Sequence, residues 1–148
     1  MPGFENVKHG QNIIQLKSGH SIYNKSGPPQ IAVLGNKDLN GANFTMGYSF
    51  LTKSFVMVGD SHKHDFDQVL FFLGGQADNI TDFDAEIEIT LEGILNLVTF
   101  PACVYIPRGT LHGPLNFKRI TRPLVFLDIT LSPEPSIRPF TSGIQAAL

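Results

Sequence analysis

The chain has 148 residues, a formal net charge of −2 and 42% hydrophobic residues. This length predicts one domain with a substantial buried core, and the slight negative charge gives no reason to expect a nucleic-acid partner. The single cysteine, Cys103, excludes an internal disulfide and fits a reducing compartment. No apolar stretch reaches membrane-spanning length and residues 1–10 lack a signal-peptide core, so we expect a cytoplasmic protein with no membrane partner.

Short apolar or alternating segments, separated by turns, run along most of the chain. In chain order they predict strands at 12–16, 30–34, 43–51, 54–58, 62–64, 68–73, 85–91, 94–99, 103–106, 111–117 and 124–131. The segment 36–43 is expected to be a polar loop, and the proline-rich tail from Ser132 ends in a short helix at 144–148 or frays. Many short strands with almost no helical periodicity predict an all-β sandwich or barrel.

Two segments carry the residues with metal chemistry. The first, GDSHKHDFDQ at 59–68, contains a His-x-His pair, which in an extended strand places His62 and His64 on the same side. The second, PRGTLHGPLN at 107–116, contains His112. Three histidines that converge with an amide or carboxylate make a site suited to Fe, Mn, Co, Ni, Cu or Zn.

Together these segments resemble the two motifs of the cupin superfamily. The first motif is His-x-His, three or four residues, Glu, six residues and Gly; here it is matched by His62, His64, Gln68 in the place of Glu, and Gly75. The second is Pro-x-Gly-x-x-His-x-x-x-Asn, matched in full by Pro107, Gly109, His112 and Asn116. Val56 and Pro101 stand where each motif usually begins with glycine, a difference that affects turns only.

The resemblance implies a double-stranded β-helix, or jelly-roll barrel, as a single cupin domain over residues 1–148. Residues 1–58 would add N-terminal strands to one sheet, 59–131 would form the cupin core, and 132–148 would be a tail. It implies one divalent metal per subunit, held by His62, His64, Gln68 and His112. It also implies a homodimer, because such N-terminal strands often extend a sheet across a twofold partner.

Gln68 is the departure that affects the chemistry. A glutamine offers a neutral carbonyl oxygen, so the metal would keep its full charge of +2 and favour an anionic substrate. The alternative is that Gln68 is a polar residue of the barrel wall, which leaves a site of three histidines.

Other side chains are candidates for places beside the ligands or in the pocket. Asp65 and Asp67 either act as a base or hold an imidazole N–H, or are solvated turn carboxylates. Arg108 either clamps a substrate carboxylate or is solvated. Tyr105 shares a strand face with Cys103, and the sequence does not tell whether this face lines the barrel; Cys103 is expected to be buried. The apolar pocket wall is expected among Phe44, Met46, Tyr48, Phe66, Phe71 and Phe72, for each of which core packing is the alternative.

Three functions follow from this pattern. The first is a metal-dependent enzyme acting on an anionic or enolic small molecule, with dioxygenase-like chemistry favoured because no acid–base pair stands out beyond the ligands and no catalytic residue can be assigned. Within the resemblance, isomerisation and decarboxylation are alternatives. The second is a non-catalytic cupin that binds a small ligand or a metal. The third, a structural protein with vestigial histidines, is disfavoured by the complete second motif.

Overall fold

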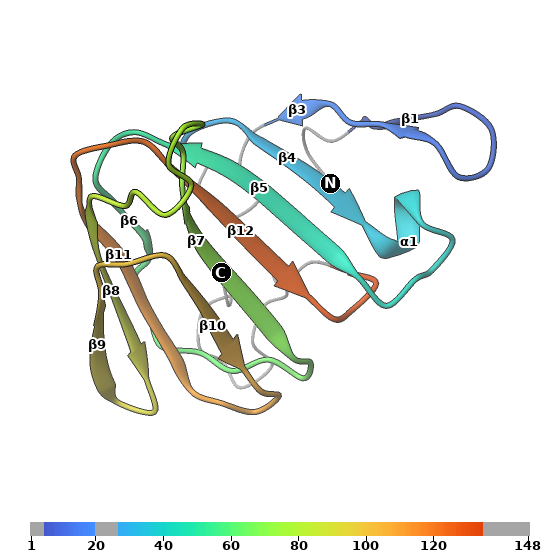
Figure 1. The fold of residues 1–148 in the computed structure, drawn as a ribbon. Coiled ribbons are helices and arrows are strands. Elements are labelled where there is room, and N and C mark those ends of the chain that lie inside the picture. Colours follow the sequence, from blue (N-terminus) through green and yellow to red (C-terminus); the bar gives the residue numbers. More distant parts are fainter. Residues whose placement is uncertain (1–4, 20–26, 135–148) are drawn as a thin grey trace.

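The computed structural model describes residues 5–19 and 27–134, and the helix expected at 144–148 lies outside them. The larger sheet has six antiparallel strands in the order β10-β7-β12-β5-β4-β3. Their bounds are β10 (Ala102–Ile106), β7 (Gln68–Gly74), β12 (Leu124–Thr130), β5 (Thr45–Leu51), β4 (Gln30–Leu34) and β3 (Ser18–Gly19). As Figure 1 shows, β4 and β3 extend this sheet beyond β5.

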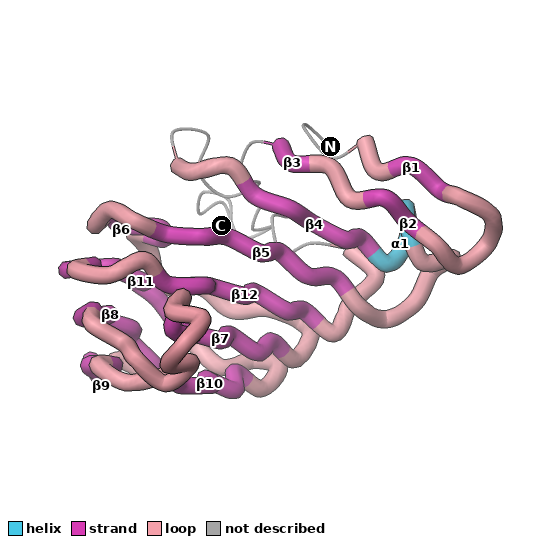
Figure 2. Tube along the Cα trace, turned by 45° about the horizontal axis from the view of Figure 1, so that its top comes forward, coloured by secondary structure: helices cyan, strands magenta, loops and turns pink. Residues whose placement is uncertain are grey.

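The smaller sheet has four antiparallel strands in the order β6-β11-β8-β9. Their bounds are β6 (Phe55–Val58), β11 (His112–Ile120), β8 (Ala85–Leu91) and β9 (Ile94–Val98). A two-stranded hairpin, β1 (Val7–Lys8) and β2 (Ile14–Gln15), lies at the far end of the larger sheet (Figure 2). The helix α1 (Gly35–Asp38) occupies part of the segment predicted as a loop, and no helix among the described residues has the length and apolar character to cross a membrane.

The core lies between the two sheets and is built on phenylalanine. Phe72 and Phe126 come from the larger sheet, Phe117 comes from the smaller one, and none of the three is exposed to solvent. The ring of Phe117 lies 5.9 Å from that of Phe72 and 5.4 Å from that of Phe126, both edge to face. Edge-to-face packing at this distance is the favourable arrangement for aromatic rings. The two sheets therefore form one sandwich, and the predicted jelly roll with its N-terminal strand extension is confirmed. Within residues 1–58 the strands β3, β4 and β5 belong to the larger sheet, whereas β6 pairs with β11 in the smaller sheet and β1 and β2 pair only with each other.

The strand β5 turns the opposite face inward from the one that its apolar residues suggested. Thr45, Gly47 and Ser49 are buried, whereas Phe50 is 45% exposed. The side chain of Gln30 lies over Gly47 on this inward face, where a Cβ would come within 2.8 Å of Gln30 Nε2. The Thr45 hydroxyl also donates to the carbonyl of Ser132. The aromatic residues of β5, Tyr48 and Phe50, are not among the residues that line the cavity described below.

Candidate metal centre

The two histidine segments are joined through their backbones. The amide of His62 donates to the carbonyl of His112 (2.8 Å), and the amide of His112 donates to the carbonyl of His62 (2.9 Å). The prediction of a strand over 62–64 was wrong, because only His62 pairs, as an isolated bridge. The amide of Gly109 also donates to the carbonyl of His64 (2.9 Å). These bonds hold the second motif against the first, so the histidines meet without a regular strand.

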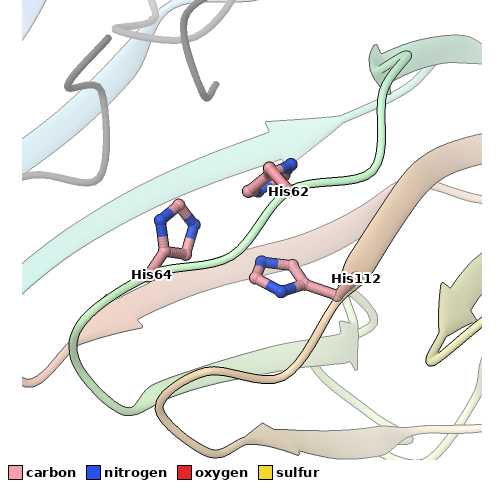
Figure 3. Close-up of side chains that lie close together, drawn as sticks. All are labelled: His62, His64 and His112. Atoms are coloured by element: carbon pink, nitrogen blue, oxygen red, sulfur yellow. The ribbon is translucent and has the colours of Figure 1, made fainter. Parts of the chain in front are cut away.

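The three imidazoles converge. One nitrogen from each of His62, His64 and His112 lies within 4.8 Å of the other two, and Figure 3 shows the rings turned toward one another. His62 and His112 are each only 5% exposed. The ring of Phe66 stacks on that of His64, with centroids 4.8 Å apart and planes 9° apart. Such a cluster of three imidazoles fits one first-row divalent metal.

Backbone carbonyls set which ring nitrogen of two histidines carries the proton. Nδ1 of His112 lies 2.8 Å from the carbonyl oxygen of Thr110, and Nδ1 of His62 lies 3.2 Å from that of Asp60. Because a carbonyl only accepts, each Nδ1 donates, and each Nε2 of the neutral ring keeps its lone pair. In metal-binding histidines, the N–H of the ring nitrogen that does not bind the metal usually donates a hydrogen bond in this way.

Burial keeps these imidazoles neutral. Desolvation, with a smaller contribution from nearby His112, lowers the pKa of His62 to about 4. Desolvation also lowers the pKa of His112. Because a metal binds the deprotonated ring, both side chains are ready for a metal at neutral pH without losing a proton first.

Gln68 lies at the start of β7 and is 5% exposed. Its Nε2 donates to Oδ1 of Asp128 over 2.7 Å, while its Oε1 is buried and accepts no hydrogen bond. Nε2 of His112 is likewise buried without a hydrogen bond. A buried acceptor without a donor costs free energy, and a cation bound between these atoms would remove that cost. The donor set therefore fits a divalent metal.

Asp128, on β12, is the site residue that the sequence analysis missed. It is 6% exposed and accepts the hydrogen bond from Gln68. The sequence did indicate that Asp128 points inward. Side chains alternate between the two faces of β12, and Asp128 follows Leu124 and Phe126 at intervals of two residues, so all three lie on the buried face. A carboxylate on the buried face of a strand needs a polar partner.

A small cavity connects these side chains. Its volume is about 20 Å³, and it is lined by Met57, Val58, His62, Gln68, Leu70, Ile89, His112, Gly113, Leu115 and Asp128. Such a volume is enough for an ion or about one water molecule. The apolar residues of its wall come from β6, β7, β8 and β11, and none of the six predicted wall residues is among them. Apart from the histidines, the lining holds one amide, one carboxylate and no lysine or arginine.

The remaining candidates lie outside this cavity. Oδ1 of Asp67 accepts from the backbone amide of Arg108 (2.8 Å), which ties together the loops of the two motifs. Asp65 and Arg108 form an ion pair of 3.3 Å in which the side chains are 83% and 68% exposed. Neither residue contributes to the cavity lining.

The strand β10 turns Cys103 and Tyr105 outward. Tyr105 is 58% exposed and Cys103 is exposed, while Ile106 is buried. The expected burial of Cys103 was therefore wrong, and Tyr105 does not reach the pocket. The sequence of β10 did not indicate which face is buried, because both faces of the strand carry apolar or aromatic side chains. Asn116, from the second motif, donates to Oε1 of Glu88 (3.2 Å) and lies outside the cavity lining.

Comparison with known proteins relates the chain to others by structure. No protein-family model and no curated protein sequence matches it. Its structure is similar to that of EutQ from Salmonella typhimurium LT2, with a TM-score of 0.54 and 14% identity over 91% of this chain and 98% of EutQ. AerE from Microcystis aeruginosa gives a TM-score of 0.53 and 12% identity, over 85% of this chain and 50% of AerE.

Oxalate decarboxylase from Bacillus subtilis gives a TM-score of 0.50 and 14% identity, over 72% of this chain and 25% of the enzyme. The chain thus spans half of AerE and a quarter of the decarboxylase. Identities this low relate the folds and leave the activities open. These similarities show the class of fold: a double-sheet jelly roll, inside which the three histidines converge.

Proposed function

We propose that the protein is a metal-dependent small-molecule enzyme of the cupin type. The observation that carries the proposal is the convergence of three imidazoles, from His62, His64 and His112, beside a cavity that also holds a buried amide oxygen of Gln68. One divalent metal per subunit would be held by these four side chains. Fe, Mn, Ni, Co, Cu and Zn all accept such nitrogen and oxygen donors.

Dioxygenase-like chemistry on a small anionic or enolic substrate fits this site best. A bound metal would supply a Lewis acid or, if redox-active, activation of O₂. The protein would supply neutral imidazoles and a wall that is largely apolar. Among the lining residues, Asp128 is the one ionisable group besides the histidines, so the chain offers few acid–base partners of its own. Isomerisation or decarboxylation stay as alternatives.

The small size of the cavity favours a second candidate function, that of a non-catalytic metal-binding protein. A volume of about 20 Å³ leaves no room for a ring-sized molecule beside a metal. A non-catalytic cupin, which binds a metal with a water or a very small ligand, would need no more space. An enzyme would need a substrate of a few atoms, or one that enters only partly.

Elemental analysis of protein purified without a metal-affinity tag tests the proposal. We expect close to one Fe, Mn, Ni, Co, Cu or Zn per chain, followed by O₂ uptake with members of a panel of small enols and 2-oxo acids. Stoichiometric metal without turnover of any compound would favour the metal-binding module. No metal, and none bound after anaerobic reconstitution, would overturn both functions.

We also propose a homodimer. The support is the exposed edge strand β9, which ends the smaller sheet and bears no charged residue. Its side chains Ile94, Leu95 and Leu97 are 67%, 61% and 53% exposed to solvent. Natural proteins usually cover or charge such an edge. Light scattering coupled to gel filtration should give twice the chain mass, and a monomer at micromolar concentration would contradict the dimer.

A further inference from the structure

We propose that Asp128 is a positioning residue of the metal centre: it orients the Gln68 amide so that Oε1 is presented to the metal, and it supplies beside that ligand the negative charge that glutamine lacks. This inference rests on the proposed metal binding and goes beyond it. It assigns a role to a residue that neither motif contains.

The orientation follows from the chemistry of the two groups. An ionised carboxylate only accepts hydrogen bonds, so it is the NH₂ of Gln68 that must face Asp128, and Nε2 does so at 2.7 Å. Turning the amide over would bring Oε1 against the carboxylate oxygen, which is repulsive. Oε1 therefore points away from Asp128, and it is buried there without a hydrogen bond. Both side chains line the cavity that His62 and His112 also line.

Asp128 also explains why glutamine stands where the cupin motif has glutamate. A glutamate at this position would place two carboxylates at hydrogen-bond distance in a buried site, and they would have to share a proton. With Gln68 the pair holds a single carboxylate, that of Asp128. In its ionised form this carboxylate would place a negative charge next to the ligand and would polarise the amide, which increases the negative partial charge on Oε1.

A purely structural role for the Gln68–Asp128 hydrogen bond is the competing explanation. It would affect stability alone and would not alter the metal. The strand register supports a direct effect on the ligand: Gln68 pairs with Thr130 on β12, so Asp128, two residues earlier on the same face, is its diagonal neighbour. Asp128 thus contacts a side chain of the proposed donor set directly.

The test uses Co²⁺, whose visible spectrum reports its ligands, with metal-stripped full-length protein. Affinity is measured by competition with a chelator for wild type, Asp128→Asn, Asp128→Leu and Gln68→Ala. Ser49→Ala is the matched control, since Ser49 is a buried polar residue of the same sheet face that does not line the cavity. Thermal unfolding of the metal-free forms separates loss of folding from loss of the ligand.

We expect Asp128→Leu to weaken Co²⁺ binding about 10- to 100-fold and to shift the visible spectrum toward that of Gln68→Ala, since partners of ligands typically have this effect. Asp128→Asn keeps an acceptor for Nε2, so its spectrum should stay near that of wild type while affinity falls because the charge is gone. In the Gln68→Ala background, Asp128→Leu should leave the spectrum unchanged. Ser49→Ala should alter neither the spectrum nor the affinity.

If Asp128→Leu does not fold, a double variant that exchanges the carboxylate and the amide provides the test. The double variant Gln68→Glu/Asp128→Asn keeps one carboxylate and one amide in contact with donor and acceptor exchanged, and should bind Co²⁺ within about tenfold of wild type. Wild-type spectrum and affinity in both Asp128 single variants would overturn the inference while leaving the metal site standing. A spectral change of equal size in the Gln68→Ala background would overturn it too. Failure of wild type to bind Co²⁺ would overturn this inference together with the proposed function.

Discussion

His62 and His112 are joined by two backbone hydrogen bonds, 2.8 and 2.9 Å long, at the point where their imidazoles meet. The residue that permits this approach is Gly113, whose φ is +97°. A Cβ on Gly113 would lie 2.3 Å from the carbonyl oxygen of Asp60 and 3.5 Å from Nδ1 of His62. Since the Asp60 carbonyl also accepts from His62 Nδ1, an added methyl group would disturb both the bridge and the ring.

The first prediction is that Gly113→Ala loosens the metal centre. Gly93→Ala is the matched control, because Gly93 has a φ of +78° and its Cβ would meet nothing within 4 Å. The control should lose about 1 kcal/mol of unfolding free energy from backbone strain alone. Gly113→Ala should lose at least about 2 kcal/mol more, since backbone atoms must move, and should also bind Co²⁺ more weakly. Denaturant unfolding and chelator competition measure the two effects; equal losses in both variants would contradict the steric argument.

The second prediction concerns the three histidines. Replacing His62, His64 or His112 with alanine removes one donor from the cluster, and metal affinity should fall more than about a hundredfold in each case. His9→Ala is the control, since His9 is exposed on the β1–β2 hairpin. The metal content of the purified variants checks the prediction, and wild-type content in all three would exclude this site. Metal addition should also raise the thermal stability of wild type and not of the three variants.

Most strands were predictable because alternation and turn residues are local signals. The strands β4 and β8 have the predicted bounds, and β7 and β12 differ by one residue at the C-terminal end. The face that each strand buries was less predictable. A period of two gives two faces, and in β5 and β10 the inward face was decided by contacts with other strands, such as that of Gln30 over Gly47.

The cluster of His62, His64 and His112 was predictable from motif spacing, and the structure brings the three together. The inward orientation of Asp128 could have been inferred from the alternation of β12, but its contact with Gln68 could not, because no local spacing links β12 to the start of β7. The cavity wall was also missed, because its residues come from four strands whose relative positions only the fold defines.

The third prediction is a pH dependence of the metal-free protein. The folded-state pKa of His62 is lowered to about 4 from an unfolded value of 6.5, chiefly by burial. Between these values the unfolded chain binds more protons than the folded one, so stability rises with pH across the window and is lost as pH falls from 6.5 toward 4. The loss from this group is at most about 3 kcal/mol. Because His112 is shifted in the same direction, it adds to the loss.

Unfolding free energies of metal-stripped protein measured between pH 4 and 8 check this dependence. In His62→Gln the fall toward low pH should be shallower, since one titrating group is gone. His9→Gln controls for loss of an exposed histidine and should follow wild type. A His62→Gln curve parallel to that of wild type would show that His62 is not the buried neutral group described above.

The fourth prediction separates two carboxylates of the loop between His64 and Gln68. Oδ1 of Asp67 accepts from the amide of Arg108 (2.8 Å) and its carbonyl accepts from the amide of Leu131 (2.9 Å), whereas Asp65 makes an exposed ion pair with Arg108. Asp67→Ala should therefore lower the unfolding free energy by about 1–2 kcal/mol, since a charged acceptor is lost, and Asp65→Ala should change it by less than about 0.5 kcal/mol. Asp67→Asn keeps an acceptor oxygen and should recover most of the loss. Equal effects of Asp65→Ala and Asp67→Ala in denaturant unfolding would mean that the loop is held by the ion pair, and that the Asp67 contact does not fix the second motif against the first.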